Sequence, residues 1–113
     1  MAESCIFCRI ARGEIPAQMV TSNKELAAFR DLNPQAPVHI LIIPKKHISS
    51  LDDAADSDLL GRMMSLAAAI ARQEKIAKTG YRTVINTGKD GGQSVDHLHI
   101  HLLGGRVMTW PPG

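Results

Sequence analysis

The segment His97-Leu98-His99-Ile100-His101-Leu102-Leu103 has the most regular pattern in the sequence, and the rest of the predicted sheet is built around it. Histidine alternates here with leucine and isoleucine, and successive side chains of a β-strand point to opposite faces. The pattern predicts a strand over residues 95–103. Its three histidines then share one face, while the aliphatic residues between them point into a core. Alternate side chains on a strand lie about 7 Å apart, so neighbouring imidazoles can act on one ligand.

The chemistry of this histidine face has three interpretations. The histidines can decorate an exposed sheet surface, although histidine is not a favoured strand residue. They can ligate zinc, as alternate histidines on a strand do. In the third interpretation, a neutral imidazole attacks phosphorus while a charged neighbour stabilises the oxygens. The preceding loop, residues 87–94, favours the third, because its glycines, Gln93 and Ser94 offer the donors that a phosphate needs.

The rest of the chain supplies the elements around this strand. Residues 4–12 predict a short helix with Ser4 as N-cap and Gly13 as its stop. The other expected strands are residues 20–22, 26–32, 38–44 and 81–86, with a turn at Asn23-Lys24 between the first two. A long helix is expected over 57–78, from the apolar stripe of Leu59, Met63, Leu66 and Ile70. This order predicts one α+β domain, residues 1–113, with a mainly antiparallel five-stranded sheet.

Composition and charge narrow the classes of function. The 113 residues are 44% hydrophobic and 21% charged, which is typical of a globular domain. A net charge of +2 gives no reason to expect nucleic-acid or membrane binding, and an aromatic content of 4% argues against a base-stacking surface. The apolar runs are too short to span a bilayer, and Met1 to Ser4 begin no secretory signal. We therefore expect a cytoplasmic protein.

Taken together, the motifs resemble those of the histidine triad family. His97-x-His99-x-His101 followed by two apolar residues is that family's signature. The other matching stretches are Phe29-Arg30-Asp31, residues 34–47, residues 91–95 and Leu103-Gly104-Gly105-Arg106. The ending Trp110-Pro111-Pro112-Gly113 resembles the nucleotide-binding branch specifically. The resemblance implies the HIT-like fold, a two-fold homodimer and binding of purine nucleoside monophosphate derivatives.

The same resemblance implies an activity and its catalytic residues. Members of this branch hydrolyse purine nucleoside phosphoramidates and aminoacyl-adenylates through a covalent nucleotidyl-histidine intermediate. His99 matches the histidine that attacks phosphorus, and His101 matches the one that contacts the phosphate. His39 matches a histidine that supports the nucleophile, and Ser94 a hydroxyl near the leaving group.

The resemblance also implies how the nucleotide is bound. Asp31 matches a carboxylate that holds the ribose hydroxyls, and Asn86 matches an amide that binds phosphate or ribose oxygen. Gln93 of the glycine-rich loop is a further expected contact. An apolar slot for the base is expected from Ile6, Phe7, Ile10, Phe29 and Leu32. Each of these five can instead be an ordinary core residue.

Cys5 and Cys8 form a C-x-x-C pair near the start of the chain. In a reducing compartment this spacing indicates metal or redox chemistry rather than a disulfide, and buried free thiols are the alternative. A tetrahedral zinc site needs two more ligands. Several bacterial histidine triad proteins bind zinc at positions that match Cys5, Cys8, His47 and His97. The resemblance thus implies a structural zinc, with no cofactor needed for catalysis.

Two other functions remain open. One is a dinucleoside polyphosphate hydrolase of the sister branch, and the other is a nucleotide-binding interaction module with incidental hydrolysis. Ser94 and the C-terminal ending favour the phosphoramidase, and a pure binder has no need of a nucleophile at His99. Arg30, Asp96 and Thr109 depart from the pattern of several relatives and could shift the preference for leaving groups.

The expected homodimer would also bear on substrate choice. We expect the strands at 81–86 to meet across the two-fold axis, and the side chains of Met63, Met64 and Ala67 to need cover from the second copy. Met108 and Trp110 of the tail would then reach the partner's active site. The alternative is that the tail packs on its own subunit.

Overall fold

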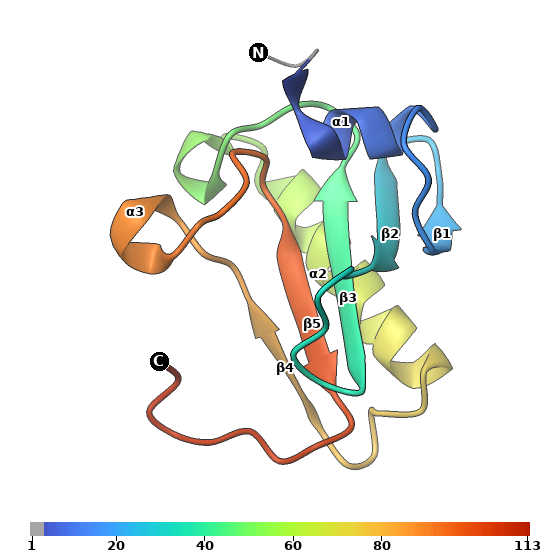
Figure 1. Cartoon of the computed structure of the whole chain (residues 1–113), viewed down its shortest axis with the longest axis vertical. Helices are drawn as coiled ribbons and strands as arrows, with labels where there is room; N and C mark the ends of the chain where they lie inside the picture. The colour runs from blue at the N-terminus through green and yellow to red at the C-terminus, as the bar shows by residue number, and fades with distance from the viewer. Residues whose placement is uncertain (1–3) are drawn as a thin grey trace.

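The strands of this chain form a single five-stranded antiparallel sheet in the order β1-β2-β3-β5-β4. The computed structural model describes residues 4–113, so residues 1–3 of the expected domain lie outside the described residues. In chain order the elements are α1 (Ile6–Ala11), β1 (Met19–Ser22), β2 (Leu26–Arg30), β3 (Val38–Pro44), η2 (Leu51–Asp53), α2 (Ser57–Gln73), β4 (Tyr81–Val84), α3 (Gly88–Gly91) and β5 (Ile100–Gly104). Figure 1 shows α2 behind the sheet and α1 across one end of it. The expected α+β architecture is confirmed.

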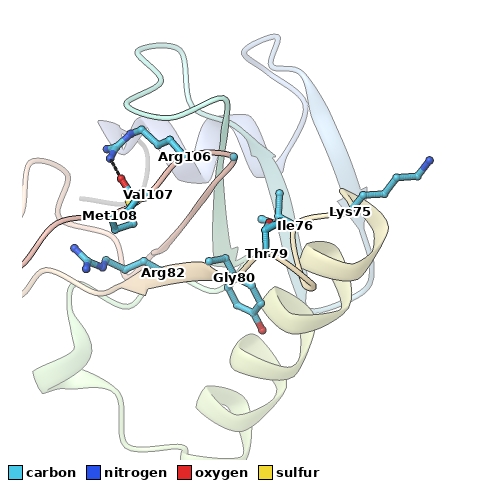
Figure 2. A pocket seen from close by; sticks show the side chains of 10 residues that line it. Lys75, Ile76, Thr79, Gly80, Arg82, Arg106, Val107 and Met108 are labelled. Atoms are coloured by element: carbon cyan, nitrogen blue, oxygen red, sulfur yellow. Dashed lines mark hydrogen bonds between the residues drawn. The ribbon is translucent and has the colours of Figure 1, made fainter.

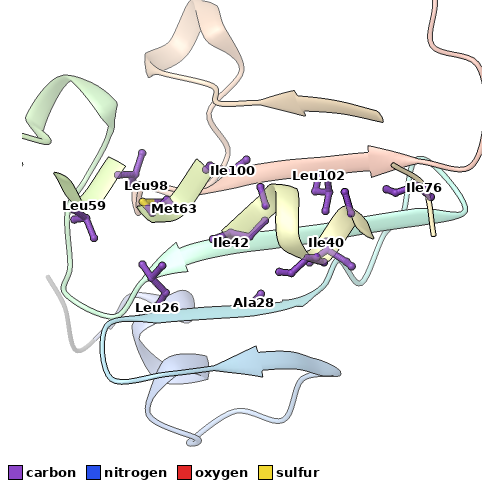
Figure 3. Packing of buried hydrophobic residues seen from close by; sticks show 13 residues of the cluster. Leu26, Ala28, Ile40, Ile42, Leu59, Met63, Ile76, Leu98, Ile100 and Leu102 are labelled. Atoms are coloured by element: carbon purple, nitrogen blue, oxygen red, sulfur yellow. The ribbon is translucent and has the colours of Figure 1, made fainter. Parts of the chain in front are cut away.

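The alternation of side chains along β3 creates two apolar layers. Ile40 and Ile42 point to the face that α2 covers, and Figure 3 shows them along β3 in the same apolar layer as Met63 of the helix. Leu41 and Ile43 point to the opposite face and pack in the cluster that contains α1. Strand β5 continues the first layer with Ile100 and Leu102, and β2 contributes Leu26 and Ala28 to it. The sheet is therefore buried on one face by α2 and leaves its other face to α1 and the histidines.

Helix α2 ends five residues earlier than the sequence predicts. The expected range was 57–78, whereas the helix closes at Gln73 with Glu74 as its C-cap. Lys75 adopts a left-handed φ of 64°, and its N–H and that of Ile76 bond to the carbonyls of Arg72 and Ala71. These bonds form a Schellman motif, which turns the chain so that Ile76 packs into the core.

Within residues 4–113, no helix is long and apolar enough to cross a membrane.

Strand β5 begins later than predicted, because its ladder stops at Ile100. The expected strand was 95–103, but pairing with β3 runs from Val38–Gly104 to Ile42–Ile100 only. The next residue of β3 that could continue the ladder is Pro44, which has no N–H to donate. Leu98 instead donates its N–H to the Ile48 carbonyl at 2.7 Å. His97 and His99 therefore lie on an irregular segment before β5, and only His101 lies in the strand.

The other boundaries differ by a few residues. The first helix spans Ile6–Ala11 rather than 4–12, and its N-cap is Cys5, whose Sγ accepts the Cys8 N–H. The strands expected at 20–22, 26–32 and 81–86 are Met19–Ser22, Leu26–Arg30 and Tyr81–Val84. The turn at Asn23-Lys24 is present, since Asn23 Oδ1 accepts the N–H groups of Glu25 and Leu26. The expected loop at 87–94 contains the single turn of α3, which ends at Gly92 in the left-handed region.

Met63 is expected to carry much of the packing between α2 and the sheet. Its side chain is fully buried, at 0% exposure, within the cluster on the α2 face. Met63→Ala should lower the free energy of unfolding by about 2–5 kcal/mol, because a cavity is left under the helix. Met19→Ala is the matched control, since Met19 is 46% exposed, and it should change stability by less than about 0.5 kcal/mol. Equal urea midpoints for the two variants would contradict this account.

Candidate active site and metal centre

A cavity of about 200 Å³ opens on the sheet face that α1 covers. His99, His101, Asp31 and Ser94 all lie in its wall. The five residues expected to form an apolar slot line it as well, namely Ile6, Phe7, Ile10, Phe29 and Leu32. Leu32 is 87% exposed and so lies at the rim rather than in a core. The structure thus brings residues from both ends of the sequence around one space.

Six further residues line the cavity that were not predicted from the sequence. The additional lining residues are Ile15, Pro16, Ala17, Arg30, Leu41 and Val95. Leu41 could have been found, because it lies two residues from His39 on β3 and so shares its face. The segment 15–17 precedes β1 and has no periodicity from which its placement could be inferred.

His99 is held by a backbone hydrogen bond that fixes its tautomer. Its Nδ1 lies 2.6 Å from the carbonyl oxygen of His97. A carbonyl can only accept, so the proton of the neutral ring is on Nδ1 and donates to that oxygen. Nε2 is then the ring nitrogen with the lone pair, and it is on the far side of the ring from the backbone. The imidazole is therefore presented as a nucleophile.

His39 and His101 form a second hydrogen-bonded pair beside the nucleophile. His39 Nε2 lies 2.9 Å from His101 Nδ1 and 3.4 Å from Asp31 Oδ2. The ring of His101 lies 4.9 Å from that of His99, centroid to centroid. Burial, with the neighbouring His99 and His39, lowers the pKa of His101 to about 4, and burial also lowers the pKa of His39. Both rings are therefore neutral at pH 7, and each carries one N–H.

Asp31 and Ser94 lie far apart in the sequence but share the cavity wall. Asp31 is half-buried, and its Oδ1 accepts the Asn33 N–H at 2.8 Å. Its Oδ2 is the oxygen near His39, so the carboxylate is fixed at both ends. Ser94 is exposed and also lines the adjoining cavity that contains Cys5 and His47.

Gln93 and Asn86 are not among the residues that line the histidine cavity. The Gln93 amide donates to the carbonyls of Ser49 and Val95, and its Oε1 accepts the Gly88 N–H. The Gln93 side chain thus ties the loop that carries Ser94 to the segment after β3. Asn86 is half-buried after β4, where its backbone lies close to Gly91.

Cys5, Cys8, His47 and His97 meet as the resemblance implied, with their ligand atoms all within 4.8 Å of one another. His97 Nδ1 lies 3.3 Å from Cys5 Sγ and 3.5 Å from Cys8 Sγ, and His47 Nδ1 lies 3.3 Å from Cys8 Sγ. Ligands of a tetrahedral zinc have S···N separations of about 3.6 Å, so the set fits this ion.

The environment of these four residues also fits a metal. His97 Nε2 donates to the Pro44 carbonyl at 2.8 Å, which leaves Nδ1 unprotonated and turned to the thiols. A carbonyl partner of this kind is typical of metal-bound histidines. Burial and the neighbouring Cys5 raise the pKa of the Cys8 thiol to about 11, so binding of a metal would have to displace its proton.

Phe7 of α1 contacts both the cluster of Cys5, Cys8, His47 and His97 and the histidine cavity. Its ring makes edge contacts with His97 at 5.9 Å and with His99 at 5.1 Å, and a third with Phe29 at 5.5 Å. The start of α1 therefore supplies Cys5 and Cys8 to the cluster and Phe7 to the cavity. The cluster and the cavity are neighbours, with the Phe7 ring in contact with both.

A larger cavity, of about 610 Å³, lies at the start of β4, and Figure 2 shows the residues that line it. It is lined by basic and apolar residues, among them Lys75, Arg82, Arg106 and Met108. Among the lining residues of this cavity in the described chain there is no histidine, cysteine or carboxylate. His99 and His101 therefore line the smaller cavity and not this one.

Comparison with known proteins gives consistent matches. The model of the HIT domain family matches residues 12–108. A protein of Escherichia coli named purine nucleoside phosphoramidase is 53% identical over 110 residues, which cover 96% of this chain and 92% of that protein. A protein of Synechococcus elongatus, named an uncharacterized HIT-like protein, is 56% identical over the full length of both. The crystal structure of a HIT family hydrolase from Legionella pneumophila has a TM-score of 0.94 and 54% identity, with 97% of this chain and 100% of that chain covered. The expected fold is thereby confirmed.

Proposed function

The chain belongs to the HIT domain family, and we propose that it is a purine nucleoside phosphoramidase. Such an enzyme is a hydrolase of phosphorus–nitrogen bonds. The Escherichia coli relative with that name is similar over almost the whole chain. The observation that carries the proposal is the hydrogen bond from His99 Nδ1 to the His97 carbonyl, because it leaves Nε2 as a nucleophile at the cavity.

In the proposed reaction, His99 Nε2 attacks the phosphorus of a nucleoside phosphoramidate. The phosphorus–nitrogen bond breaks, and the amine leaves with a proton taken from solvent, which the Ser94 hydroxyl of the cavity wall would relay. The bond between phosphorus and Nε2 makes a nucleotidyl-imidazole. Water then attacks this phosphorus, gives up its proton to solvent, and releases the nucleoside monophosphate and free His99. Dividing one displacement into two lets a weak nucleophile, water, act on an activated phosphorus.

His101 and the residues of the cavity wall would hold the substrate. His101 is neutral, and its Nε2–H is available to donate to a phosphate oxygen. The Asp31 carboxylate would accept from the ribose hydroxyls, and the apolar wall with Phe7 and Phe29 would bind the base. We assign Gln93 to holding the loop of Ser94, and we retain Asn86 as a phosphate or ribose contact.

The decisive experiment compares turnover on three substrates: adenosine phosphoramidate, guanosine phosphoramidate and a diadenosine polyphosphate. We expect kcat/KM to be larger for the two phosphoramidates by at least about tenfold. A preference for the diadenosine polyphosphate would favour the sister branch of hydrolases. Binding of nucleoside monophosphate without turnover of any of the three would favour an interaction module.

We further propose that the metal held by Cys5, Cys8, His47 and His97 is zinc and that its role is structural. Two thiolates and two imidazoles complete a closed tetrahedral set, which leaves no position for a substrate. When bound, zinc would supply a fixed junction between α1 and the segments beside the sheet. Cys5 and Cys8 are free thiols, which agrees with the expected cytoplasmic location.

We also propose a homodimer formed through β4. This strand is at one edge of the sheet, so its outer backbone groups have no neighbouring strand in the described chain. Tyr81 is a large exposed apolar residue on this edge strand, and Met64 is a large exposed apolar residue of α2. Met63 and Ala67, by contrast, are covered by the chain's own sheet, so the expectation that they need a second copy was wrong.

The C-terminal tail is expected to influence the choice of leaving group. Trp110 is 80% exposed, and its ring lies 5.9 Å from the Arg82 guanidinium of the same chain, which also donates to the Thr109 carbonyl. Deletion of residues 109–113 should alter the ratio of kcat/KM between aromatic and aliphatic amine leaving groups more than it alters affinity for nucleoside monophosphate. Trp110→Ala is the smaller control change, and an unaltered ratio in both variants would contradict a role for the tail.

A further inference from the structure

The hydrogen bonds of the active site continue outward from His101 to the surface of the protein. His39 Nδ1 accepts the backbone N–H of Gln35 at 3.0 Å, in addition to the bond between His39 Nε2 and His101 Nδ1. The Gln35 carbonyl in turn accepts two bonds from Arg106, from Nε at 3.1 Å and Nη2 at 3.0 Å. The Gln35 N–H and carbonyl belong to the two peptide groups that meet at its Cα, so the backbone of this one residue links an exposed guanidinium to the buried His39 ring.

This path determines the proton positions on both rings. A backbone amide can only donate, so His39 Nδ1 must accept, and the proton of the neutral ring is on Nε2. His39 Nε2–H then donates to His101 Nδ1, which places the proton of His101 on its Nε2. That proton is the one His101 can offer to a phosphate oxygen. The direction of one amide N–H thus decides whether His101 presents a donor or an acceptor to the substrate.

The amide of Gln35 belongs to a loop that needs an external support. The loop contains Pro34 and Pro37, which have no N–H, and it is closed by the bond from the Asp31 N–H to the His39 carbonyl. Arg106 supplies the support from the segment after β5, and its third bond, from Nη1 to the Val107 carbonyl, is drawn in Figure 2. Nε and Nη2 of the planar guanidinium group both donate to the single Gln35 carbonyl oxygen, and these two converging bonds fix its direction.

Gly105 brings Arg106 close enough to make these bonds. A Cβ at position 105 would lie 2.8 Å from Pro37 Cβ, and the residue has a φ of +91°, which side chains rarely allow. The segment after β5 is therefore docked directly against the loop. Gly105 packs against Pro37 while Arg106 bonds to the Gln35 carbonyl, so the two segments are joined by both packing and hydrogen bonds.

A cation on Asp31, His39 and His101 is the competing use of the same ligand atoms, which lie within 4.8 Å of one another. The separation of His39 Nε2 and His101 Nδ1 is 2.9 Å, the length of an N–H···N hydrogen bond. Two nitrogens on one tetrahedral metal would be about 3.3 Å apart. The Gln35 amide also accounts for the remaining ring nitrogen of His39. The cluster is therefore a proton-ordering path.

We propose that Arg106 is a positioning residue of the active site, which holds the Gln35 amide so that His39 and His101 keep their Nε2–H tautomers. The proposal rests on the proposed phosphoramidase for its catalytic consequence, since a donor at His101 matters where a phosphate is bound. Without Arg106, the loop would sample orientations in which the Gln35 N–H no longer meets His39 Nδ1, and a fraction of His101 would face the substrate without a proton.

The test measures ring tautomers and kinetics in the same variants. The full chain is labelled with ¹⁵N in its histidine rings, and the Nδ1 and Nε2 signals of His39 and His101 are read by two-dimensional NMR. In the unsubstituted chain both rings should show Nε2–H. In Arg106→Ala both should show mixed tautomers, while His99 keeps Nδ1–H because its partner is the His97 carbonyl. For adenosine phosphoramidate, kcat should fall about tenfold, the equivalent of one charge-assisted hydrogen bond, with KM changed less than about twofold.

Matched variants separate this role from a loss of surface charge. Arg62→Ala removes another exposed guanidinium, which makes two bonds to Glu25, and it should leave tautomers and kcat unchanged. Arg106→Lys keeps the positive charge but loses the planar pair of donors, so its kcat and tautomer populations should lie between those of Arg62→Ala and Arg106→Ala. An ester in place of the peptide bond between Pro34 and Gln35 removes the Gln35 N–H and leaves every side chain in place. This variant should show the same mixed tautomers, and it tests the proposal even if Arg106→Ala folds poorly.

Two results would overturn the proposal: unchanged tautomers in Arg106→Ala and in the ester variant, or an equal fall of kcat in Arg62→Ala. The NMR signals need no turnover. If the unsubstituted chain hydrolyses no phosphoramidate, the proposed function fails, while the ring tautomers still decide whether Arg106 positions His39.

Discussion

Replacement of His99 by alanine should lower kcat on adenosine phosphoramidate by about 10⁴- to 10⁶-fold, the loss seen when a nucleophile that acts in a unit is removed. The reason is that no other described side chain presents an unprotonated ring nitrogen at the cavity with the geometry of His99 Nε2. His101 cannot replace it, because its Nδ1 is occupied by the bond from His39. Steady-state turnover with a chromogenic or fluorogenic amine leaving group measures the loss.

Binding of nucleoside monophosphate is the control for this variant. The ribose and base would contact Asp31 and the apolar wall, so calorimetry should give a dissociation constant within about tenfold of that of the unsubstituted chain. Rapid quenching of the unsubstituted enzyme should yield a nucleotidyl adduct on His99 by mass spectrometry. Retention of more than about 1% of the activity by His99→Ala, or an adduct on another residue, would refute the assignment.

Loss of the metal centre is expected to have the largest effect on stability. Purified protein should contain about one zinc per chain, and Cys5→Ser with Cys8→Ser should contain none. At free zinc about 1,000 times its dissociation constant, the bound ion contributes about 4 kcal/mol to the free energy of unfolding. For a chain of this size, that corresponds to a fall of roughly 15 °C in the melting temperature.

A chelator provides the matched control for the metal. It should lower the melting temperature of the unsubstituted chain to that of the double variant, and it should leave the double variant unaffected. Activity should largely survive in both, because the four ligands would leave the ion no open position. Absence of metal by elemental analysis, in protein purified under reducing conditions without chelators, would contradict the site.

The sequence predicted the fold well where side chains repeat with a regular period. The alternation predicted Leu98, Ile100 and Leu102 on one face, and they pack in the cluster under α2, while His99 and His101 line the cavity on the other face. The ends of elements were predicted less well, because they depend on particular partners. The ladder of β5 stops because Pro44 on the neighbouring strand has no N–H, and α2 ends because Lys75 enters the left-handed region. Neither cause can be read from the hydrophobic pattern of the element itself.

The candidate site divides in the same way. The five residues expected at an apolar slot do line one cavity, and the four residues expected to ligate a metal lie together, since both sets were taken from motifs. The resemblance could not reveal the contacts that join Arg106 to His39 through Gln35. Arg106 and Gln35 are 71 residues apart, Gln35 and His39 are 4 apart, and they meet through loops whose course no motif predicts. Nor could it show that the Gln93 amide is already bonded to Ser49 and Val95.

Strand order has a consequence for the synthesis of this protein. β5 is the last strand to leave the ribosome, yet it lies between β3 and β4 in the sheet. Until it emerges, β4 has no strand beside it, and one edge of the apolar β3 stays open to other nascent chains. The segment that closes this edge also carries His97, His99 and His101. A partly translated chain therefore lacks both a closed sheet and a nucleophile, so hydrolysis and protection from aggregation arise in the same final step of folding.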